Sequence, residues 1–566
     1  MFDRLSQNAR LVIASLLSVS IIFGWQILFV EPMIKEQQEE MERVALTMPK
    51  DEQHIPQKLE ERNQIISNEI NKGTRVKFQN TKVKGSINLV GARIDDLILE
   101  KYSQSLEEQD KKVTLLSPGK ALDAYFIELG WIAGDTSFKA PDKKALWNAD
   151  KNELKSGETL TLSHNADGII YKIAISLDDD YLFSVNQTVI NKSGREIAVA
   201  PYALANRINN LLEQNNFVFH EGLIGVSNST LKEVSYSDMQ ENKKMDLGDY
   251  SWVGFSDKYW LTSFISHKDA GYKVKATYSE RDNVGRFQIG FNPDEATKIQ
   301  NDSSHSWGHF KIFAGAKELE LLEHYQDTLD IKLFDRAVDF GMLYFITKPI
   351  SYLLHMFYQF LNNFGVAILA LTVLIKIMLF PLAYKGFKGM NRLKDLQPKI
   401  MQLKEKFADD PGAFQKAMLD VYKKEKVNPM GGCLPILLQI PVFFALYKVL
   451  YVSIEMRQAP FFWWIKDLSI PDPLSIFNLF GLIPIDLPPF LMIGILPILM
   501  SLTMFIQQSL NPEPADPVQA KVMKFLPVIL LFMFTSFPSG LIIYWTWSNI
   551  LSIAQQIFIK RISTKG

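Results

Sequence analysis

The chain has 566 residues, a net charge of −1 at pH 7, 47% hydrophobic residues and a single cysteine, Cys433. One cysteine excludes an intramolecular disulfide, and the near-zero net charge is the sum of two unlike parts. Residues 31–347 hold 38 Lys and Arg against 49 Asp and Glu, a net charge of −11, whereas the other 249 residues hold 23 against 13, a net charge of +10. We therefore expect the two parts to face different solvents.

Six apolar stretches are long enough to cross a bilayer, because about 20 helical residues span its ~30 Å hydrocarbon core. The predicted spans are residues 11–30, 361–384, 430–453, 490–508, 522–537 and 541–559. The first span follows Arg4 and Arg10 and lacks a small-residue cleavage pattern at its end. It therefore predicts an uncleaved signal anchor that follows a cytoplasmic N-terminus of residues 1–10.

The acidic part of the chain is predicted to be external and rich in strands. Residues 31–73 are polar and rich in Glu and Gln, which is typical of a linker or a fraying helix. Residues 74–330 contain short alternating or β-branched runs, such as Ile169 to Leu177 and Tyr181 to Ile190, separated by turn residues. This pattern predicts an all-β sandwich.

Candidate ligand sites in the predicted sandwich have structural alternatives. His305 and His309 have i,i+4 spacing, but their segment looks extended, so surface histidines are favoured over a metal site. Trp252, Tyr259 and Trp260 form a possible platform for a sugar, although aromatic residues at this spacing more often belong to a core. The chain has no P-loop, HExxH zinc motif or G-x-S-x-G elbow. We expect no cofactor, no metal and no catalytic residue.

Residues 331–360 show helical periodicity. Apolar residues such as Leu333, Phe334 and Val338 lie on one side, with Asp335 and Arg336 on the other. The pattern predicts an amphipathic helix along the outer membrane surface, bent into the second span at the Lys-Pro pair of residues 348–349.

The connection 385–427 is basic, with 11 Lys and Arg against six acidic residues. Its apolar residues are spaced 3, 4, 3, 4, as in a coiled-coil seam; they are Leu393, Leu396, Ile400, Leu403 and Phe407. Asp410 and Pro411 suit the N-cap and first position of a second helix. We expect two antiparallel basic helices in the cytoplasm. Either their charge only enforces topology, or they dock an acidic partner such as ribosomal RNA or the anionic leaflet.

Basic residues in the short loops predict the orientation of the spans. The connection 385–427 and the tail 560–566 are basic, whereas the loop 454–489 has two basic residues against four acidic ones. Both termini and the loop 509–521 are thus expected in the cytoplasm, and the acidic domain outside. In the outer loop, Phe461 to Trp464 suit an aromatic belt at the headgroup level, or a turn packed on the outer domain.

Lys376 is a single charge inside an otherwise apolar span, where even a lenient scale assigns it a cost of about 2.5 kcal/mol. Other polar residues of the predicted spans are Thr372, Gln439, Ser501, Thr503, Ser548, Asn549, Gln555 and Gln556. We expect them to line a wet cavity that opens to the cytoplasm, because Lys376 lies only about 13 Å of helical rise from Lys385. Alternatively, Lys376 snorkels and the others form interhelical hydrogen bonds.

Several motifs carry a resemblance to a known family. The motifs are NPMGGCLP at residues 428–435, RQAPF at 457–461, FPSGL at 537–541 and LQPKI at 396–400. Together with Gln439 and Tyr544, they resemble the YidC family of bacterial membrane protein insertases, which includes the mitochondrial and chloroplast insertases. The core match covers about residues 350–560, and the order of signal anchor, external sandwich, basic hairpin and five-span core is similar. The loop Pro471 to Pro489 is longer than in familiar members.

The resemblance implies an insertase without ATP chemistry. In the family, a positively charged groove that is open to the cytoplasm and to lipid receives the hydrophilic part of a nascent membrane protein. Lys376 stands where the family usually has arginine, and Trp545 where some members have a substrate-contacting tyrosine. Lysine keeps the charge but lacks the guanidinium fork. The predicted groove residues are Lys376, Thr372, Gln439, Ser501, Thr503, Tyr544 and Trp545.

The implied partners are nascent membrane proteins, the general secretion translocon, the ribosome and signal-recognition targeting factors, all at the bacterial inner membrane. Candidate ribosome or targeting contacts in the hairpin are Lys394, Lys399, Lys404 and Lys406. Two other functions are compatible with the residues. One is a solute transporter, since intramembrane charge often marks a substrate path, although no inverted repeat is apparent. The other is a receptor or scaffold acting through the sandwich.

Overall fold

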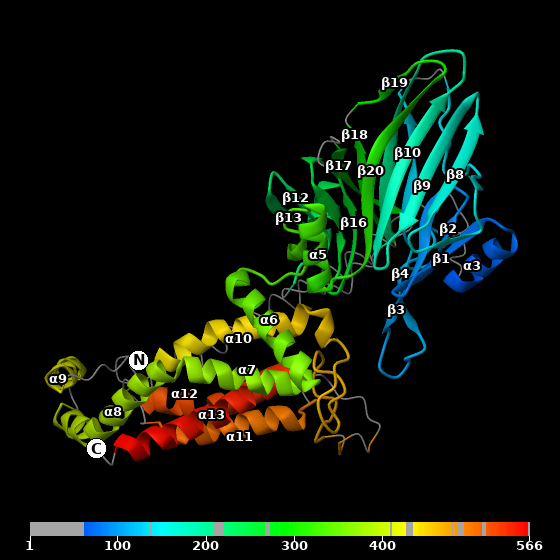
Figure 1. Cartoon of the computed structure of the whole chain (residues 1–566). Coiled ribbons are helices and arrows are strands. Elements are labelled where there is room, and N and C mark those ends of the chain that lie inside the picture. The colour runs from blue at the N-terminus through cyan, green and yellow to red at the C-terminus, as the bar shows by residue number, and fades with distance from the viewer. Residues whose placement is uncertain are drawn as a thin grey trace, which may run out of the picture. The chain divides into compact units, whose positions relative to one another are not determined.

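The computed structural model describes residues 61–563, except for 135–137, 209–218, 267–271, 282–283, 294, 408–409, 426–433, 478, 481–482, 484–491 and 512–516. The predicted signal anchor, most of the predicted linker and residues 428–433 of the NPMGGCLP motif lie outside the described residues. The chain divides into two compact units (Figure 1). The β unit comprises Pro56–Tyr344 with Val452–Arg457, and the helical unit includes Phe345–Tyr451 and Gln458–Gly566.

The described residues of the β unit contain two large sheets. In spatial order, the first runs β14 (Lys244–Asp249), β17 (Tyr272–Arg281), β18 (Val284–Pro293), β11 (Ile197–Ile208), β5 (Tyr125–Ala133), β3 (Arg93–Ser103), β2 (Val83–Asn88), β1 (Arg75–Gln79) and β7 (Glu153–Lys155), with β19 (Thr297–Ile299) beside β11 and β4 (Lys112–Leu116) beside β3. The second runs β13 (Thr230–Ser235), β12 (Gly222–Ser227), β15 (Trp252–Ser256), β16 (Trp260–Ile265), β20 (Ser303–Ala316), β10 (Leu182–Asn191), β9 (Ile169–Leu177), β8 (Thr159–Ala166) and β6 (Asn148–Ala149). Of these strand pairs, β1 with β7 is parallel and the others are antiparallel.

Alternating burial explains why these segments are strands. Along β9, every second side chain is buried, because successive side chains of a strand point to opposite faces. Aromatic rings then meet across the two sheets: Phe78 lies 5.3 Å from Phe183, and Phe264 lies 5.5 Å from Phe291, between ring centroids. The predicted β-sandwich is confirmed.

The β unit also contains α3 (Arg62–Asn71), α4 (Tyr236–Asn242), α5 (Leu319–Leu329) and two short 3-10 turns, η4 (Phe334–Ala337) and η6 (Ile454–Met456). The amphipathic helix that the sequence predicts over 331–360 is shorter in the structure, where α6 begins only at Tyr344 and ends at Leu361. Leu333 and Gly341 have positive φ angles of 54° and 67°. A helix cannot continue through residues in this left-handed region, which local periodicity does not reveal.

The helical unit contains long helices that run side by side (Figure 1). After α6 come α7 (Phe364–Met378), α8 (Phe380–Lys406), α9 (Pro411–Lys424), α10 (Leu434–Val452), α11 (Ile495–Ser509), α12 (Pro517–Met533), the 3-10 turn η8 (Phe534–Ser536) and α13 (Ser539–Ser563). The last helix packs on α7, α8 and α11, and α11 packs on α12. Helix α13 therefore lies against α7 and α11, which both carry polar residues of the predicted spans.

The predicted span 361–384 is broken in the structure. Helix α7 ends at Met378, α8 starts at Phe380, and the two meet at a bend of 66°. Pro381 in the first turn of α8 explains the restart, because proline lacks a backbone N–H and suits the start of a helix better than its interior.

Among the described residues, no single helix is both long enough and apolar enough to span a bilayer. The bent pair of α7 and α8, taken together, has sufficient length and apolar composition. Helices α10 and α11 include shorter apolar segments, Gln439–Val452 and Ile495–Ser509. The six spans remain a prediction.

The basic hairpin follows its predicted pattern. Its first helix ends at Lys406, and Asp410 caps the second, since its Oδ1 accepts a hydrogen bond of 2.9 Å from the N–H of Ala413. Ile400 of the predicted seam is buried, whereas Lys394 on the same helix is exposed. The predicted N-cap and helix break are confirmed.

A polar cavity beside Lys376

A cavity of about 70 Å³ lies between α7, α8, α10, α11 and α13 in the helical unit. Its polar lining residues are Thr372, Lys376, Gln439, Gln507, Asn511, Tyr544, Ser552, Gln555 and Gln556. Apolar residues such as Leu379 and Phe387 complete the wall. The volume is sufficient for several water molecules, and the polar lining offers them partners.

Lys376 reaches this cavity from the second half of α7. Its ammonium donates a hydrogen bond of 2.7 Å to the Ser552 hydroxyl oxygen and one of 3.4 Å to Oε1 of Gln439. Both of these partners are neutral. The amide nitrogen of Gln439 in turn donates to the hydroxyl of Ser548, which is buried. The hydrogen-bond partners of Lys376 among the described residues are thus neutral dipoles.

Two further hydrogen bonds lie close to Lys376, one between helices and one within α7. Gln555 of α13 donates from Nε2 to the backbone carbonyl of Lys376, at 3.3 Å. The Thr372 hydroxyl donates to the carbonyl of Ile368 in its own helix, at 2.6 Å, and Thr372 is almost completely buried. A threonine that bonds to the preceding turn is satisfied without a partner from another helix. Thr372 is thus a wall residue whose donor is already used.

The structure brings together four of the seven residues that the sequence predicts for a groove. Lys376, Thr372, Gln439 and Tyr544 line the cavity. The remaining three residues, Ser501, Thr503 and Trp545, do not line it and make other contacts.

The three residues outside the cavity join neighbouring helices. Ser501 donates to the carbonyl of Pro527 at 2.9 Å, which ties α11 to α12. Thr503 accepts a hydrogen bond of 3.1 Å from Nδ2 of Asn549, which ties α11 to α13. Trp545 packs edge-on against Phe443 of α10, with ring centroids 4.7 Å apart.

Three polar lining residues were not predicted: Gln507, Asn511 and Ser552. Ser552 follows Ser548 by four residues, so the two share a face of α13, and this spacing is a signal that the sequence contains. Gln507 in the last turn of α11 and Asn511 just beyond its end have the same spacing. Asn511 accepts a hydrogen bond of 3.4 Å from Gln556 of α13. The spacing within the sequence does not reveal that α13 is the partner helix.

The four candidate lysines of the hairpin are exposed along α8. Lys399 forms an ion pair of 3.0 Å with Glu425, and the Lys406 ammonium lies 5.5 Å from the ring centroid of Phe407. An exposed pair of this kind contributes little to stability, so these side chains can rearrange on contact with a partner.

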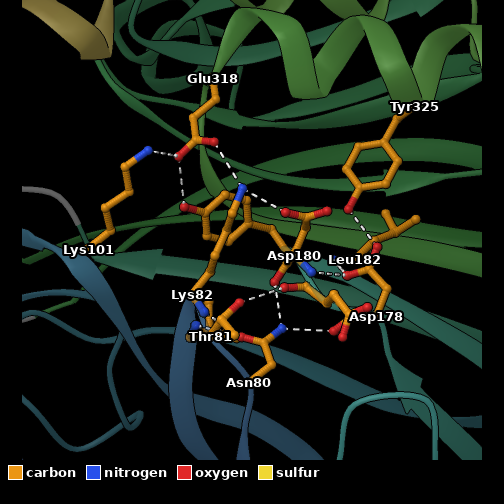
Figure 2. A network of polar contacts seen from close by, with 12 residues as sticks. Asn80, Thr81, Lys82, Lys101, Asp178, Asp180, Leu182, Glu318 and Tyr325 are labelled. Carbon is orange, nitrogen blue, oxygen red and sulfur yellow. Dashed lines mark hydrogen bonds and ion pairs between the residues drawn. The ribbon is translucent and has the colours of Figure 1, made fainter. Parts of the chain in front are cut away.

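The β unit has a dense polar network, but its members are satisfied by one another (Figure 2). Glu318 accepts hydrogen bonds from Lys82 at 3.0 Å, Tyr102 at 2.6 Å and Lys101 at 3.1 Å. Burial alone would raise the pKa of the Glu318 carboxyl, but the bonds from Tyr102 and Lys82 outweigh it and hold this pKa below its usual value. Lys82 also pairs with Asp180, in the turn between β9 and β10 of the second sheet, at 2.6 Å. The network therefore links the ends of β2 and β3 in the first sheet to the ends of β10 and β20 in the second.

The other sequence candidates of the β unit include one core residue, Trp252, and two histidines of strand β20. Trp252 is fully buried and donates from its indole nitrogen to the carbonyl of Lys332, at 2.9 Å, so its interpretation as a core residue is confirmed. His305 and His309 lie on strand β20, in the extended backbone that the sequence predicts. Among the described residues, no three or more His, Cys, Asp or Glu side chains form a group able to hold a metal ion.

Comparison with known proteins gives two family matches that together cover most of the chain. The 60Kd inner membrane protein family matches residues 356–565, and the YidC periplasmic domain family matches residues 75–353. The membrane protein insertase YidC of Rickettsia bellii is 47% identical over 557 residues, covering 98% of this chain and 99% of the relative. The same protein of Rickettsia prowazekii is 47% identical over 561 residues, with the same coverage. A crystal structure of an active YidC insertase with its first transmembrane domain resolved is similar with a TM-score of 0.35 and 15% identity, covering 85% of this chain and 92% of that one.

Proposed function

The chain belongs to the YidC family of membrane protein insertases, and we propose that the cavity around Lys376 receives the polar part of a nascent membrane protein. Its function is to insert proteins into the bacterial inner membrane. The observation that carries the proposal is the hydrogen bonding of the Lys376 ammonium to two neutral side chains, Ser552 and Gln439.

A cation suits this role because its partners among the described residues, Ser552 and Gln439, are neutral and do not cancel its charge. An acidic or polar segment that enters the cavity gains an electrostatic partner where the surroundings are otherwise apolar. It also exchanges bulk water for the hydroxyl and amide groups of the wall, so it avoids part of the cost of leaving water. The cavity then lowers the barrier to crossing without any covalent step.

The apolar part of the client needs a different surface. Helix α12 exposes four large apolar side chains, which supports an apolar surface along which the client's hydrophobic segment enters lipid. They are Phe525, Val528, Ile529 and Phe532. Such a route requires no nucleotide hydrolysis, because the hydrophobic segment moves down its own free-energy gradient. We also propose that the protein works without ATP hydrolysis, and that it has six membrane spans with both termini in the cytoplasm.

The basic hairpin is included as the docking arm for the ribosome or a targeting factor. Its exposed lysines supply positive charge that would attract an acidic partner such as ribosomal RNA. A crosslinker placed at Lys394 or Lys404 should react with a ribosome that carries a membrane-protein nascent chain. Crosslinks to neither the ribosome nor a targeting factor would remove the hairpin from this role. Cooperation with the general secretion translocon belongs to the same proposal.

Neutralising the lysine tests the cavity. In cells depleted of other insertase activity, Lys376→Ala should slow insertion of a small client with an acidic external tail by on the order of tenfold, equivalent to ~1.4 kcal/mol of barrier. Lys376→Arg should retain most of the rate, because it keeps the charge. Lys385→Ala is the matched control, since Lys385 is an exposed lysine of α8 that does not line the cavity. Equal insertion by Lys376→Ala and the control would contradict the proposal.

A further inference from the structure

The loop between α10 and α11 contains a long stretch without charge. Residues 473–485 have no Asp, Glu, Lys or Arg, and eight of the thirteen are Leu, Ile or Phe. The cavity and the basic hairpin do not involve this loop. Two polar residues of the loop, Asp472 and Ser475, are nevertheless buried and hydrogen-bonded.

Asp472 attaches the loop to the start of α11. Its carboxylate accepts hydrogen bonds from the indole nitrogen of Trp464 at 3.0 Å, from the N–H of Leu474 at 3.1 Å and from the N–H of Leu496 at 2.9 Å. The last bond satisfies a free donor in the first turn of α11. At Gly494, an added Cβ would lie 2.6 Å from the Asp472 side chain, so a smaller residue than alanine is needed for this close approach.

Backbone hydrogen bonds fold the described part of the loop into a compact turn. The N–H of Phe480 donates to the carbonyl of Ser475 at 2.8 Å, and the N–H of Ile476 donates to the carbonyl of Ile493 at 3.1 Å. The Ser475 hydroxyl accepts from the N–H of Phe477 at 3.2 Å. These bonds give the turn a defined inner side and a defined outer side.

The two sides have the reverse of the usual polarity. The polar residues Asp472 and Ser475 are 5% and 0% exposed, whereas Phe477, Leu479 and Phe480 are 49%, 52% and 48% exposed. A surface turn in water normally shows its polar groups and buries its aromatic ones. Ile476 and Ile483 continue the exposed apolar side. The neighbouring Phe462 and Trp463 are exposed too.

We propose that the apolar side of this turn, formed among the described residues by Ile476, Phe477, Leu479, Phe480 and Ile483, is an anchor that inserts into the outer leaflet of the bilayer. The proposal rests on the proposed membrane spans, since α10 and α11 are the helices that the loop connects. Both helices expose apolar side chains of their own, such as Phe444 and Leu502, and the turn, which is tied to the start of α11, exposes further ones. Lipid is the partner that fits, because the side chains are large and apolar and the stretch carries no charge that would select a protein surface.

The anchor has a physical consequence for the cavity. Asp472 fixes the turn to the first residues of α11, and the last turn of the same helix contains Gln507, which lines the cavity. A turn that reaches about 5–10 Å into the boundary between headgroups and acyl chains would therefore set the depth of α11 in the membrane. The depth of the cavity wall would follow from it.

Spin labels on the full chain test the proposal. Cys433→Ser removes the only cysteine, after which Phe480→Cys, Leu502→Cys and Leu122→Cys each provide one labelling site. The proteins are reconstituted in vesicles of phosphatidylethanolamine and phosphatidylglycerol, and the collision rates of the label with oxygen and with a nickel chelate are measured. Leu502 calibrates a lipid-facing helix position, and Leu122, which is 65% exposed in the β unit, calibrates water.

The expected result is that the Phe480 label, like the Leu502 label, collides with oxygen in preference to the nickel chelate, while the Leu122 label does the reverse. A Phe480 label as accessible to nickel as that at Leu122, with Leu502 still in lipid, would overturn the anchor and leave the spans intact. A Phe480 label shielded from both reagents would also overturn it, in favour of a protein partner. If the Leu502 label is in water as well, the proposed spans fail together with the anchor. None of these readouts depends on insertion activity.

Discussion

The ammonium of Lys376 on α7 lies 2.7 Å from the hydroxyl oxygen of Ser552 on α13, so two residues 176 positions apart in the chain share one hydrogen bond. A hydrogen bond to a charged donor is stronger than one between neutral groups. It orients the lysine toward the cavity without cancelling its charge. The position of α13 against α7 therefore determines where the positive charge is available.

Removing the hydroxyl should weaken insertion by less than removing the charge. A hydrogen bond to a charged group contributes roughly 1.5–3 kcal/mol, and waters of the cavity can replace part of it, so Ser552→Ala should slow insertion a few-fold. The double variant Lys376→Ala with Ser552→Ala should be no slower than Lys376→Ala alone, as a double-mutant cycle of insertion rates would reveal. Ser501→Ala is the control, because Ser501 bonds to Pro527 outside the cavity. Fully additive losses would contradict a shared role of Lys376 and Ser552.

Placing a carboxylate beside the lysine should make the insertase selective against acidic clients. Gln439 accepts from the Lys376 ammonium at 3.4 Å, so Gln439→Glu provides an internal counter-ion in the position of the amide. We expect slower insertion of clients with acidic tails and little change for clients with neutral tails, measured as the ratio of the two rates. Gln508→Glu adds the same charge on α11 without lining the cavity. An equal effect of both variants would show that only net charge matters.

The start of α7 should tolerate no added methyl group. Asn363 caps the helix by accepting from the N–H of Val366 at 3.1 Å, and a Cβ at Gly365 would lie 2.0 Å from the Phe461 ring. Overpacking of this kind costs about 1–3 kcal/mol, so Gly365→Ala should lower the unfolding temperature of the purified chain in detergent. Adding Phe461→Leu should recover part of the loss.

Gly389→Ala on α8 is the matched control for that variant. An added Cβ there has no atom within 4 Å, and alanine favours a helix more than glycine does, so we expect no loss of stability. A drop in unfolding temperature for Gly389→Ala equal to that for Gly365→Ala would refute the steric explanation.

Alkaline pH should stabilise the β unit through Lys317. This side chain is 2% exposed and donates to the Ser256 hydroxyl at 3.1 Å. Burial lowers the pKa of the Lys317 ammonium from 10.5 to about 8, although Asp257 and Asp339 partly oppose the shift. The unfolded chain therefore binds more protons than the folded one between about pH 8 and 10.5, and stability rises with pH in that window as the folded lysine loses its charge.

Below about pH 8 both states are protonated, and the cost of the buried charge is fully present. Lys317→Met should thus slow hydrogen exchange of β15 and β16 at pH 7 and remove the contribution to pH dependence between pH 8 and 10.5. Hydrogen exchange on the full chain measures both effects. Lys311 is a less buried lysine of β20, so Lys311→Met provides the comparison. Faster exchange in Lys317→Met at pH 7 would contradict the assignment of a net cost to the charge.

Several features of the fold follow from short-range patterns, and the sequence predicts them. Alternation along Ile169–Leu177 predicts a strand with one buried face, and the structure has it as β9. Asp410 and Pro411 predict a cap and a helix start, and both are present. In each case, the interaction that determines the structure joins residues only a few positions apart. The family motifs are equally local, and they predict the insertase function.

The sequence also singled out Lys376 as the unusual charge, but only the tertiary structure identifies its partners. Ser552, Gln507 and Asn511 reach the cavity because α11 and α13 pack beside each other, and no pattern within one helix contains that information. The same holds for Ser501, Thr503 and Trp545, whose contacts lie outside the cavity. It holds as well for the late start of α6, which the backbone angles of Leu333 and Gly341 impose. Periodicity, capping and charge determine which segments form and what chemistry they carry; packing between distant segments determines which of their side chains meet.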